Sequence, residues 1–280
     1  MTAATQVLRG LLNLEQIEQD IFRGQSPHTS VQRVFGGQVA AQALAAAGRT
    51  VADDRLPHSL HAYFVRPGDP SLPIVYRVTR IRDGGSFATR WVTAVQRGAT
   101  IFTTSVSFQQ AAPGPEHQID PPPIALPPPS AAGTTGWMAD VAAAGPPEMY
   151  WMWDPFDIVI PSEQPGRHAS RMWLRAAEAL PDDPFLHATV LTYATDLTLL
   201  PTAALGHDLR PGPSGGIDMK SLDHAVWFHR PFRADEWLLF DQHSPSMAAA
   251  RGLATGQIFT EAGVLVASVV QEGLIRLTDD

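Results

Sequence analysis

Residues 36–48 read Gly-Gly-Gln-Val-Ala-Ala-Gln-Ala-Leu-Ala-Ala-Ala-Gly and contain no charged side chain. A helix that is apolar or small on every side is buried on every side, because no polar face is left for water. Residues 186–200, Leu-His-Ala-Thr-Val-Leu-Thr-Tyr-Ala-Thr-Asp-Leu-Thr-Leu-Leu, have the same character and hold a single carboxylate. The sequence therefore predicts two buried helices, each enclosed by other elements.

Strand-like runs of residues follow each predicted helix, and turns rich in Gly, Pro and Asp separate most of them. After the first helix they are 59–65, 74–82, 87–96 and 100–109, and after the second they are 222–229, 236–243, 249–259 and 264–271. Ahead of them, residues 14–21 space their apolar side chains by three and four, which predicts a short amphipathic helix.

The two halves repeat one another in particular residues. Phe64-Val-Arg-Pro67 matches Phe228-His-Arg-Pro231, and the last strand of each half ends at a Gln, Gln109 or Gln271. The spacing from Tyr76 to Arg90 equals that from Trp237 to Arg251. One helix and four strands, given twice, indicate two copies of an α+β unit. We predict a double hot-dog fold, two tandem halves in which an antiparallel sheet wraps round a central buried helix. Chance similarity between β-rich segments is the alternative.

Proline marks the join between the halves. Of the 25 prolines, 8 lie between Pro113 and Pro129. Consecutive prolines continue neither a helix nor a central strand. We predict a semi-rigid linker over residues 113–135, between an N-terminal half at 1–112 and a C-terminal half at 136–280.

Composition excludes several classes of protein. The 280 residues hold 20 Lys and Arg against 28 Asp and Glu, a net charge of −8, and show no basic face for nucleic acid. There is no Cys, which excludes disulfides, zinc–thiolate sites and a thiol nucleophile. No metal or nucleotide motif is present, so we expect no metal and no cofactor. No membrane-length apolar run and no signal-peptide pattern are visible, so we expect a cytoplasmic location.

Asp196 is the first candidate for a catalytic residue. It is the only carboxylate in residues 186–200, which also lack Lys and Arg. A carboxylate on a fully buried helix is costly unless it is hydrogen-bonded, and perturbed carboxylates of this kind often mark functional sites. The alternative is a structural Asp that nearby amides or a helix end satisfy.

Three further positions are weaker candidates. By strand alternation Gln271 shares a face with Leu265 and Val269, where its amide would need partners. It could orient a water or bind a carbonyl, or it could be a strand end facing solvent. Gly36 and Gly37 open the first buried helix, where small residues let a substrate oxygen reach backbone amides. Close packing of that helix is the alternative.

A rival signal lies at Gly212-Pro-Ser214-Gly-Gly216, which matches the nucleophile-elbow pattern of serine hydrolases. The elbow needs a buried strand before the Ser and a helix after it. Pro211 and Pro213 favour an open loop instead, so this reading is a minor alternative. His224 and His229, five apart on a predicted strand, point to opposite faces and do not share a metal.

The chain also resembles the acyl-CoA thioesterase II family, the double hot-dog thioesterases, over nearly its whole length. The motifs that carry the resemblance are Leu12-Asn-Leu-Glu15, Val34-Phe-Gly-Gly-Gln-Val39, Tyr63-Phe-Val-Arg-Pro-Gly-Asp69, Glu116-His-Gln118, Tyr193-Ala-Thr-Asp-Leu197, Asp223-His224, Trp227-Phe-His-Arg-Pro-Phe232 and Val270-Gln-Glu-Gly273.

The resemblance implies hydrolysis of acyl-CoA to free fatty acid and CoA, with CoA as part of the substrate. The family's site is an Asp, a Thr or Ser, and a Gln, which fall on Asp196, Ser221 and Gln271. Without the resemblance, Ser221 is an ordinary loop serine. Direct attack by a water held at these residues is the implied mechanism. The family precedent also implies a homodimer or homotetramer.

Other expectations follow for the ligand and for rival activities. We expect Arg side chains to meet the CoA phosphates, with Arg251 as a candidate and Arg90, its repeat counterpart, as a weaker one. The first half lacks a carboxylate between Gly36 and Arg49, so one working site per chain is expected. A non-catalytic acyl-CoA-binding hot-dog protein and a hot-dog enoyl-CoA hydratase are the alternatives. The hydratase would need a His five residues after its Asp, where this chain has Pro201.

Overall fold

The computed structural model describes residues 8, 10–27, 33–123, 127, 151–207, 209–211 and 216–278. The first half contains β1 (Glu15–Glu18), β2 (Ile21–Gly24), α2 (Gly36–Gly48), β3 (Arg55–Phe64), β4 (Ile74–Asp83), β5 (Phe87–Gln96) and β6 (Ala99–Gln110). The second half contains β7 (Phe156–Val159), β8 (Ala169–Ala176), α4 (Pro184–Thr195), the 3₁₀ turns η2 (Leu200–Ala203) and η3 (Leu205–His207), β9 (Arg210–Pro211), β10 (Gly216–Ser221), β11 (Asp223–Phe228), β12 (Leu238–Ala248), β13 (Arg251–Thr260) and β14 (Leu265–Leu277).

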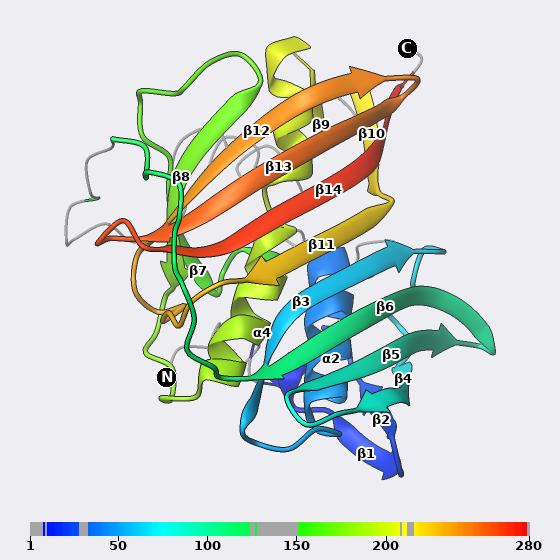
Figure 1. Cartoon of the computed structure of the whole chain (residues 1–280). Helices are drawn as coiled ribbons and strands as arrows, with labels where there is room; N and C mark the ends of the chain where they lie inside the picture. Colours follow the sequence, from blue (N-terminus) through cyan, green and yellow to red (C-terminus); the bar gives the residue numbers. More distant parts are fainter. Residues whose placement is uncertain are drawn as a thin grey trace.

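The strands of the described residues form one continuous sheet, whose main path is β1-β2-β4-β5-β6-β3-β11-β14-β13-β12-β8-β7. Off this path, β10 pairs with β14, and β9 pairs with β10. The two halves join where β3 pairs antiparallel with β11, from Tyr63 opposite Asp223 to Ser59 opposite Trp227. Figure 1 shows this seam at the middle of the molecule, with β3 and β11 side by side. The predicted double hot-dog fold is confirmed, since each half wraps a sheet round its own helix.

Both helices are enclosed as their composition predicts. In α2 every residue from Gly37 to Ala47 is buried, and α4 is buried from His187 to its last residue. The core round α2 includes Leu44 and Phe108, and the core round α4 includes Leu191. The helices also pack on each other, because Gly48 leaves the space that the ring of Phe185 fills. This packing brings the start of α2 to the end of α4 (Figure 1).

The eight strands predicted from the sequence are all present, with ends shifted by up to six residues. The predicted helix over residues 14–21 is wrong. Those residues form β1 and part of β2, joined by a turn in which Asp20 has φ 57. All four residues of β1 are exposed, including Ile17, so the spaced apolar residues do not form one buried face; Leu14, just before β1, packs in the core round α2. Strands β7, β8, β9 and β10 were not predicted.

The second helix ends earlier than predicted. Residues 186–200 were expected to be helical, but α4 stops at Thr195 and Leu197 N–H bonds to the carbonyl of Ala194, three residues back. Pro201 has no N–H to continue a regular helix, and the chain turns into η2 instead. This early end places Asp196 at the helix terminus.

The predicted linker is described only in part. Residues 113–123 and 127 contain no helix or strand, and the rest of the segment 113–135 lies outside the described residues. The domain boundaries at 112 and 136 stay predictions. Within the described part, Gln118 bonds to the carbonyl of Gly263 at 2.8 Å and to the N–H of Leu265 at 3.0 Å. These bonds hold the segment against the start of β14.

Candidate active site

Asp196 is the residue that caps the C-terminus of α4, and it is partly buried, with one side facing a cavity. The helix begins with Asp183, whose carboxylate accepts the N–H groups of Phe185 and Leu186, and with Pro184 at its first position. These are standard start signals. The apolar side chains of α4 then fix the position of the helix in the core. The position of Asp196, which follows the last turn, is fixed with it.

Gln271 and Ser221 both bind one oxygen of this carboxylate. The Gln271 amide donates to Asp196 Oδ1, and to Ser221 Oγ at 3.0 Å. Ser221 Oγ donates to the same Oδ1 at 3.3 Å. The three side chains come from β14, from the end of β10 and from α4, and they close a ring of hydrogen bonds. Gln271 is fully buried in β14, so the alternative of a solvent-facing strand end is wrong.

The other half of the chain supplies the remaining contacts of Asp196. The backbone N–H of Gly37 donates to the carboxylate from the first turn of α2. A Cβ on Gly36 would lie 2.6 Å from Asp196 Oδ2, and one on Gly37 would lie 2.5 Å from the Tyr193 carbonyl. Both glycines are therefore required by close packing, and Oδ2 lies toward the start of α2.

Burial raises the pKa of Asp196 from 3.8 to about 6, even though the hydrogen bonds from Gln271, Gly37 and Ser221 lower it. Desolvation is the largest effect because no Lys or Arg bonds to the carboxylate. A carboxylate with a pKa near 6 is mostly ionised at pH 7 and still accepts a proton readily. These are the properties of a general base.

Asp223 and His224 form hydrogen bonds with the chain neighbours of Gln271 and Asp196. Asp223 accepts the N–H of Glu272, the residue after Gln271, at 2.7 Å. Thr195, the residue before Asp196, donates to the Thr192 carbonyl and shares a 2.9 Å hydrogen bond with His224 Nε2. Since the Thr195 proton is used by Thr192, His224 Nε2 is the donor. Burial lowers the pKa of His224 to about 4, so this ring is neutral at pH 7.

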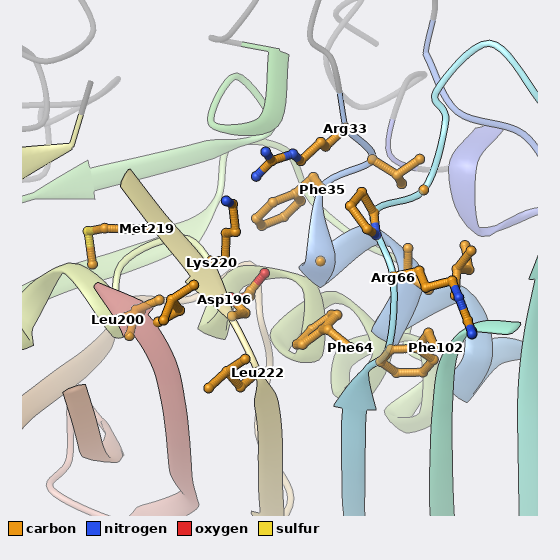
Figure 2. Close-up of a pocket in the computed structure, with 18 of the residues that line it drawn as sticks. Arg33, Phe35, Phe64, Arg66, Phe102, Asp196, Leu200, Met219, Lys220 and Leu222 are labelled. Carbon is orange, nitrogen blue, oxygen red and sulfur yellow. The ribbon is translucent and has the colours of Figure 1, made fainter. Parts of the chain in front are cut away.

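A cavity of about 560 Å³ opens above Asp196. Figure 2 shows the carboxylate of Asp196 among the labelled lining side chains, with Phe64 and Phe102 on one side and Leu200 and Met219 on the other. The lining is mainly apolar, as in sites for small organic ligands. Gly36 and Ser221 also line it, whereas Gln271 lies behind them. A thioester carbonyl entering the cavity would meet Asp196 and the start of α2 together.

Three cationic side chains border the cavity, and the sequence pattern did not single them out. They are Arg33, Arg66 and Lys220, the one lysine of the chain. Figure 2 shows Arg33 and Lys220 on the same side of the cavity, beyond Asp196. Lys220 precedes Ser221 directly, so its position beside a candidate residue was the available signal.

The two arginines proposed from the repeat lie elsewhere. Arg251 pairs with Glu272 at 3.0 Å on an exposed surface and does not line the cavity. Arg90 is buried and binds Thr50 and the carbonyl of Arg82, so it is a structural residue of the first half. As a CoA ligand, Arg90 is therefore excluded by its burial, and Arg251 stays a prediction.

The rival nucleophile, Ser214, lies outside the described residues. Trp153 borders the cavity, and Trp151 packs edge-on against Phe35. Within the described ranges no group of three or more His, Asp or Glu side chains is placed to hold a metal ion. No described helix is long and apolar enough to cross a membrane.

A double hot-dog fold with a buried carboxylate, a hydroxyl and an amide below an apolar cavity defines a class, the hot-dog thioester hydrolases. Two family models match the chain, "Acyl-CoA thioesterase" over residues 156–274 and "Acyl-CoA thioesterase N-terminal domain" over 25–109. Acyl-coenzyme A thioesterase 8 of Homo sapiens is 39% identical over 285 residues, covering 95% of this chain and 88% of its own. The chain belongs to the acyl-CoA thioesterase family and is a thioester hydrolase.

Two further relatives are similar to this chain along its whole length. Acyl-CoA thioesterase 2 of Haemophilus influenzae is 36% identical, with 96% of each chain covered. Among solved structures, an acyl-CoA thioesterase II from Mycobacterium marinum is 43% identical, covers 97% of this chain and 99% of its own, and has a TM-score of 0.80. Both halves of the chain are therefore shared with these proteins.

Proposed function

We propose that the protein hydrolyses acyl-CoA to a free fatty acid and CoA by direct attack of water, with Asp196 as the general base. The observation that carries this proposal is the ring of hydrogen bonds among Asp196, Ser221 and Gln271 at the bottom of the cavity. It leaves Asp196 Oδ2, on the side of α2, to accept a proton from water.

In the proposed step, a water oxygen attacks the thioester carbonyl carbon and its proton passes to Asp196. The tetrahedral intermediate then collapses, the C–S bond breaks, and the proton returns to the CoA thiolate. A positioned general base contributes about 10²–10⁴ to the rate. No covalent acyl-enzyme forms in this scheme: the Ser221 hydroxyl, which donates to Asp196, is assigned to orienting the water.

The start of α2 supplies the proposed oxyanion site. The first N–H groups of a helix have no partner within the helix and carry a partial positive charge. Gly37 N–H is engaged by Asp196, and Gly36, which lines the cavity, has no side chain to cover the backbone. We assign the Gly36 amide to the developing oxyanion, a contact typically worth about 10²–10³ in rate.

The charged rim of the cavity suits the other end of the substrate. CoA carries phosphates, and Arg33, Arg66 and Lys220 are the cations that border the cavity. Local cations bind phosphates even on a chain of net charge −8. We propose that these three residues are better placed for CoA than Arg251.

The experiment is a thiol-release assay over acyl-CoA substrates of increasing chain length. The chain has no Cys, so the protein adds no thiol background to the signal. Free CoA together with fatty acid is the expected product. A hydratase would instead leave the thioester intact, and a binding protein would release nothing. An acyl adduct on Ser221 or Ser214, found by mass spectrometry, would contradict direct water attack.

The structure does not favour the alternative of a hot-dog enoyl-CoA hydratase. No histidine is among the described residues that line the cavity, and Pro201 stands five residues after Asp196. A cytoplasmic location and a homodimer or homotetramer remain part of the proposal, and size-exclusion chromatography with light scattering tests the latter. The proposed chemistry uses no cofactor, since each step is assigned to a residue or to water.

A further inference from the structure

A second cavity of about 850 Å³ lies beside the first residues of the predicted linker. The end of β6, the start of β3, the end of β11, the start of α4 and residues 111–119 surround it. In Figure 1 the chain leaves β6 next to the lower end of α4 and runs past β11 and β14. None of the residues that line this cavity belongs to the catalytic cavity.

The second cavity is the repeat counterpart of the catalytic one. Residues 64–67, Phe-Val-Arg-Pro, line the catalytic cavity, and the matching residues 228–231, Phe-His-Arg-Pro, line the second. Counted along the matched strands, Ala112 in the second cavity corresponds to Leu274 in the first. Two copies of one unit, joined in a continuous sheet, thus form two cavities from equivalent segments.

Two of the three catalytic groups are missing from this counterpart, whereas Gln109, the repeat counterpart of Gln271, lines it. Asp196 caps α4, whereas the residue that caps α2 is Arg49, and its side chain turns away to the Leu14 carbonyl. The repeat position of Ser221 is Pro57, which has no hydroxyl. A thioester held in the second cavity would therefore meet no counterpart of the Asp196 carboxylate and no counterpart of the Ser221 hydroxyl. The carboxylate and the hydroxyl that do line it, Glu116 and Ser268, are bonded to Arg230 and His229.

The chemistry of the lining still suits an amphipathic ligand. Its apolar side chains include Phe228, Phe232 and Leu265, and Arg230 is the cation at its edge. Arg230 donates to Glu116 at 3.3 Å and to the His117 carbonyl at 3.1 Å. The Glu116 side chain is 76% exposed, so this ion pair is weak in water and an anionic ligand can replace it.

We propose that the second cavity binds an acyl chain with an anionic head group and does not hydrolyse it. The acyl-CoA substrate and the fatty acid product both have this chemistry. The identity of the ligand rests on the proposed function, whereas the site itself rests on the repeat and on the cavity. The chain would then hold two acyl ligands, one at the catalytic centre and one at its inactive counterpart.

The test counts ligands at equilibrium with two probes, a dodecyl-CoA thioether, which is not hydrolysed, and dodecanoate. Calorimetric titration of the wild type is expected to give two thioether molecules per chain. Ala112→Trp fills the second cavity from an exposed position and should leave one. Ala99→Trp, exposed at the other end of β6 and outside both cavities, is the matched control and should keep two.

A second variant tests the role of Arg230 without filling the cavity. Glu116→Gln removes the competing carboxylate and should strengthen binding at the second site by up to about fivefold. Binding of dodecanoate to the same site would show that the carboxylate alone suffices, and binding of the thioether only would assign the site to acyl-CoA. An unchanged affinity in Glu116→Gln would contradict the role of Arg230.

Two results would overturn the second site. One is a single thioether per wild-type chain, and the other is two per chain in Ala112→Trp. Each is distinguishable from failure of the proposed function, because that failure appears as a wild type that releases no CoA. CoA release by Ala112→Trp at saturating substrate is expected to equal that of the wild type.

Discussion

The Asp196 carboxylate is asymmetric in its surroundings. Oδ1 accepts hydrogen bonds from Gln271 and Ser221, and Oδ2 lies toward Gly36 and the cavity. Desolvation raises its pKa to about 6 against these bonds. The same residue is thus held rigidly on one side, while its basicity is raised for proton transfer on the other.

The first prediction concerns pH. Because the base must be ionised, kcat/KM should rise with pH through an apparent pKa of about 6 and then level off. Steady-state kinetics between pH 5 and 8, with a substrate chain length held constant, measure this. A profile that is flat over that range would contradict Asp196 as the base.

A matched pair of variants sharpens the pH test. The Gln271 hydrogen bond lowers the pKa of Asp196, so Gln271→Leu should move the rise in kcat/KM to higher pH. Gln257→Leu lies on the neighbouring strand β13 and faces away from the site, and should leave the profile in place. Equal shifts in both variants would indicate a general effect on the sheet.

At the scale of elements, the site is a meeting of the start of α2 with the end of α4. Gly37 is essential there, because a Cβ would lie 2.5 Å from the Tyr193 carbonyl. Gly37→Ala should push the helices apart and weaken the hydrogen bond to Asp196. A bond to a charged group is worth about 1.5–3 kcal/mol, so kcat/KM should fall about tenfold or more. In Gly85→Ala, where a Cβ meets nothing within 4 Å, kcat/KM should not change.

Arg90 provides a stability prediction at the same scale. Its guanidinium bonds the Thr50 hydroxyl and carbonyl, just after α2, and the Asp83 carboxylate at the end of β4. Lys has no planar fork to make these bonds together. Arg90→Lys should lower the free energy of unfolding by about 2–4 kcal/mol in a urea titration and leave KM unchanged. A raised KM with unchanged stability would reverse the structural assignment of Arg90.

Much of this element arrangement is readable from the sequence. The two uncharged runs predict the buried helices, and the strands near them are apolar enough to be recognised. Strand β10, with Asp218 and Lys220 among its six residues, gives no such signal. Asp196 and Gln271 are recognisable because a polar group stands among apolar ones. The cations of the cavity are not, because 19 of the 20 basic residues are scattered arginines and only tertiary structure selects among them.

At the scale of the whole molecule, neither half has a complete site. Asp196, Ser221 and Gln271 come from the second half, and Gly36, Gly37 and Phe64 from the first. The sequence offered Gly36 and Gly37 as candidates together with residues of the second half, but it did not predict their contact with Asp196, because contacts between the halves leave no trace in a local pattern. The repeat also shows what the second cavity lacks, since Arg49 and Pro57 stand where the acid and the hydroxyl would be.

The continuous sheet makes a prediction about folding. Pairing of β3 with β11 and packing of α2 on α4 couple the halves, so they should unfold in one cooperative transition. Urea unfolding followed by circular dichroism and by CoA release should give coincident midpoints. Two resolved transitions, with activity lost in the first, would show that the halves are stable separately.

The most direct measurement is CoA release by Asp196→Asn, with its free energy of unfolding measured in parallel. The buried carboxylate favours the folded state below pH 4, when it is neutral, and that contribution is lost as pH rises through about 6. A shift from 3.8 to about 6 corresponds to about 3 kcal/mol. The account predicts a folded variant, up to about 3 kcal/mol more stable at pH 8, whose kcat is lower by about 10²–10⁴. A folded variant with wild-type turnover would contradict Asp196 as the base.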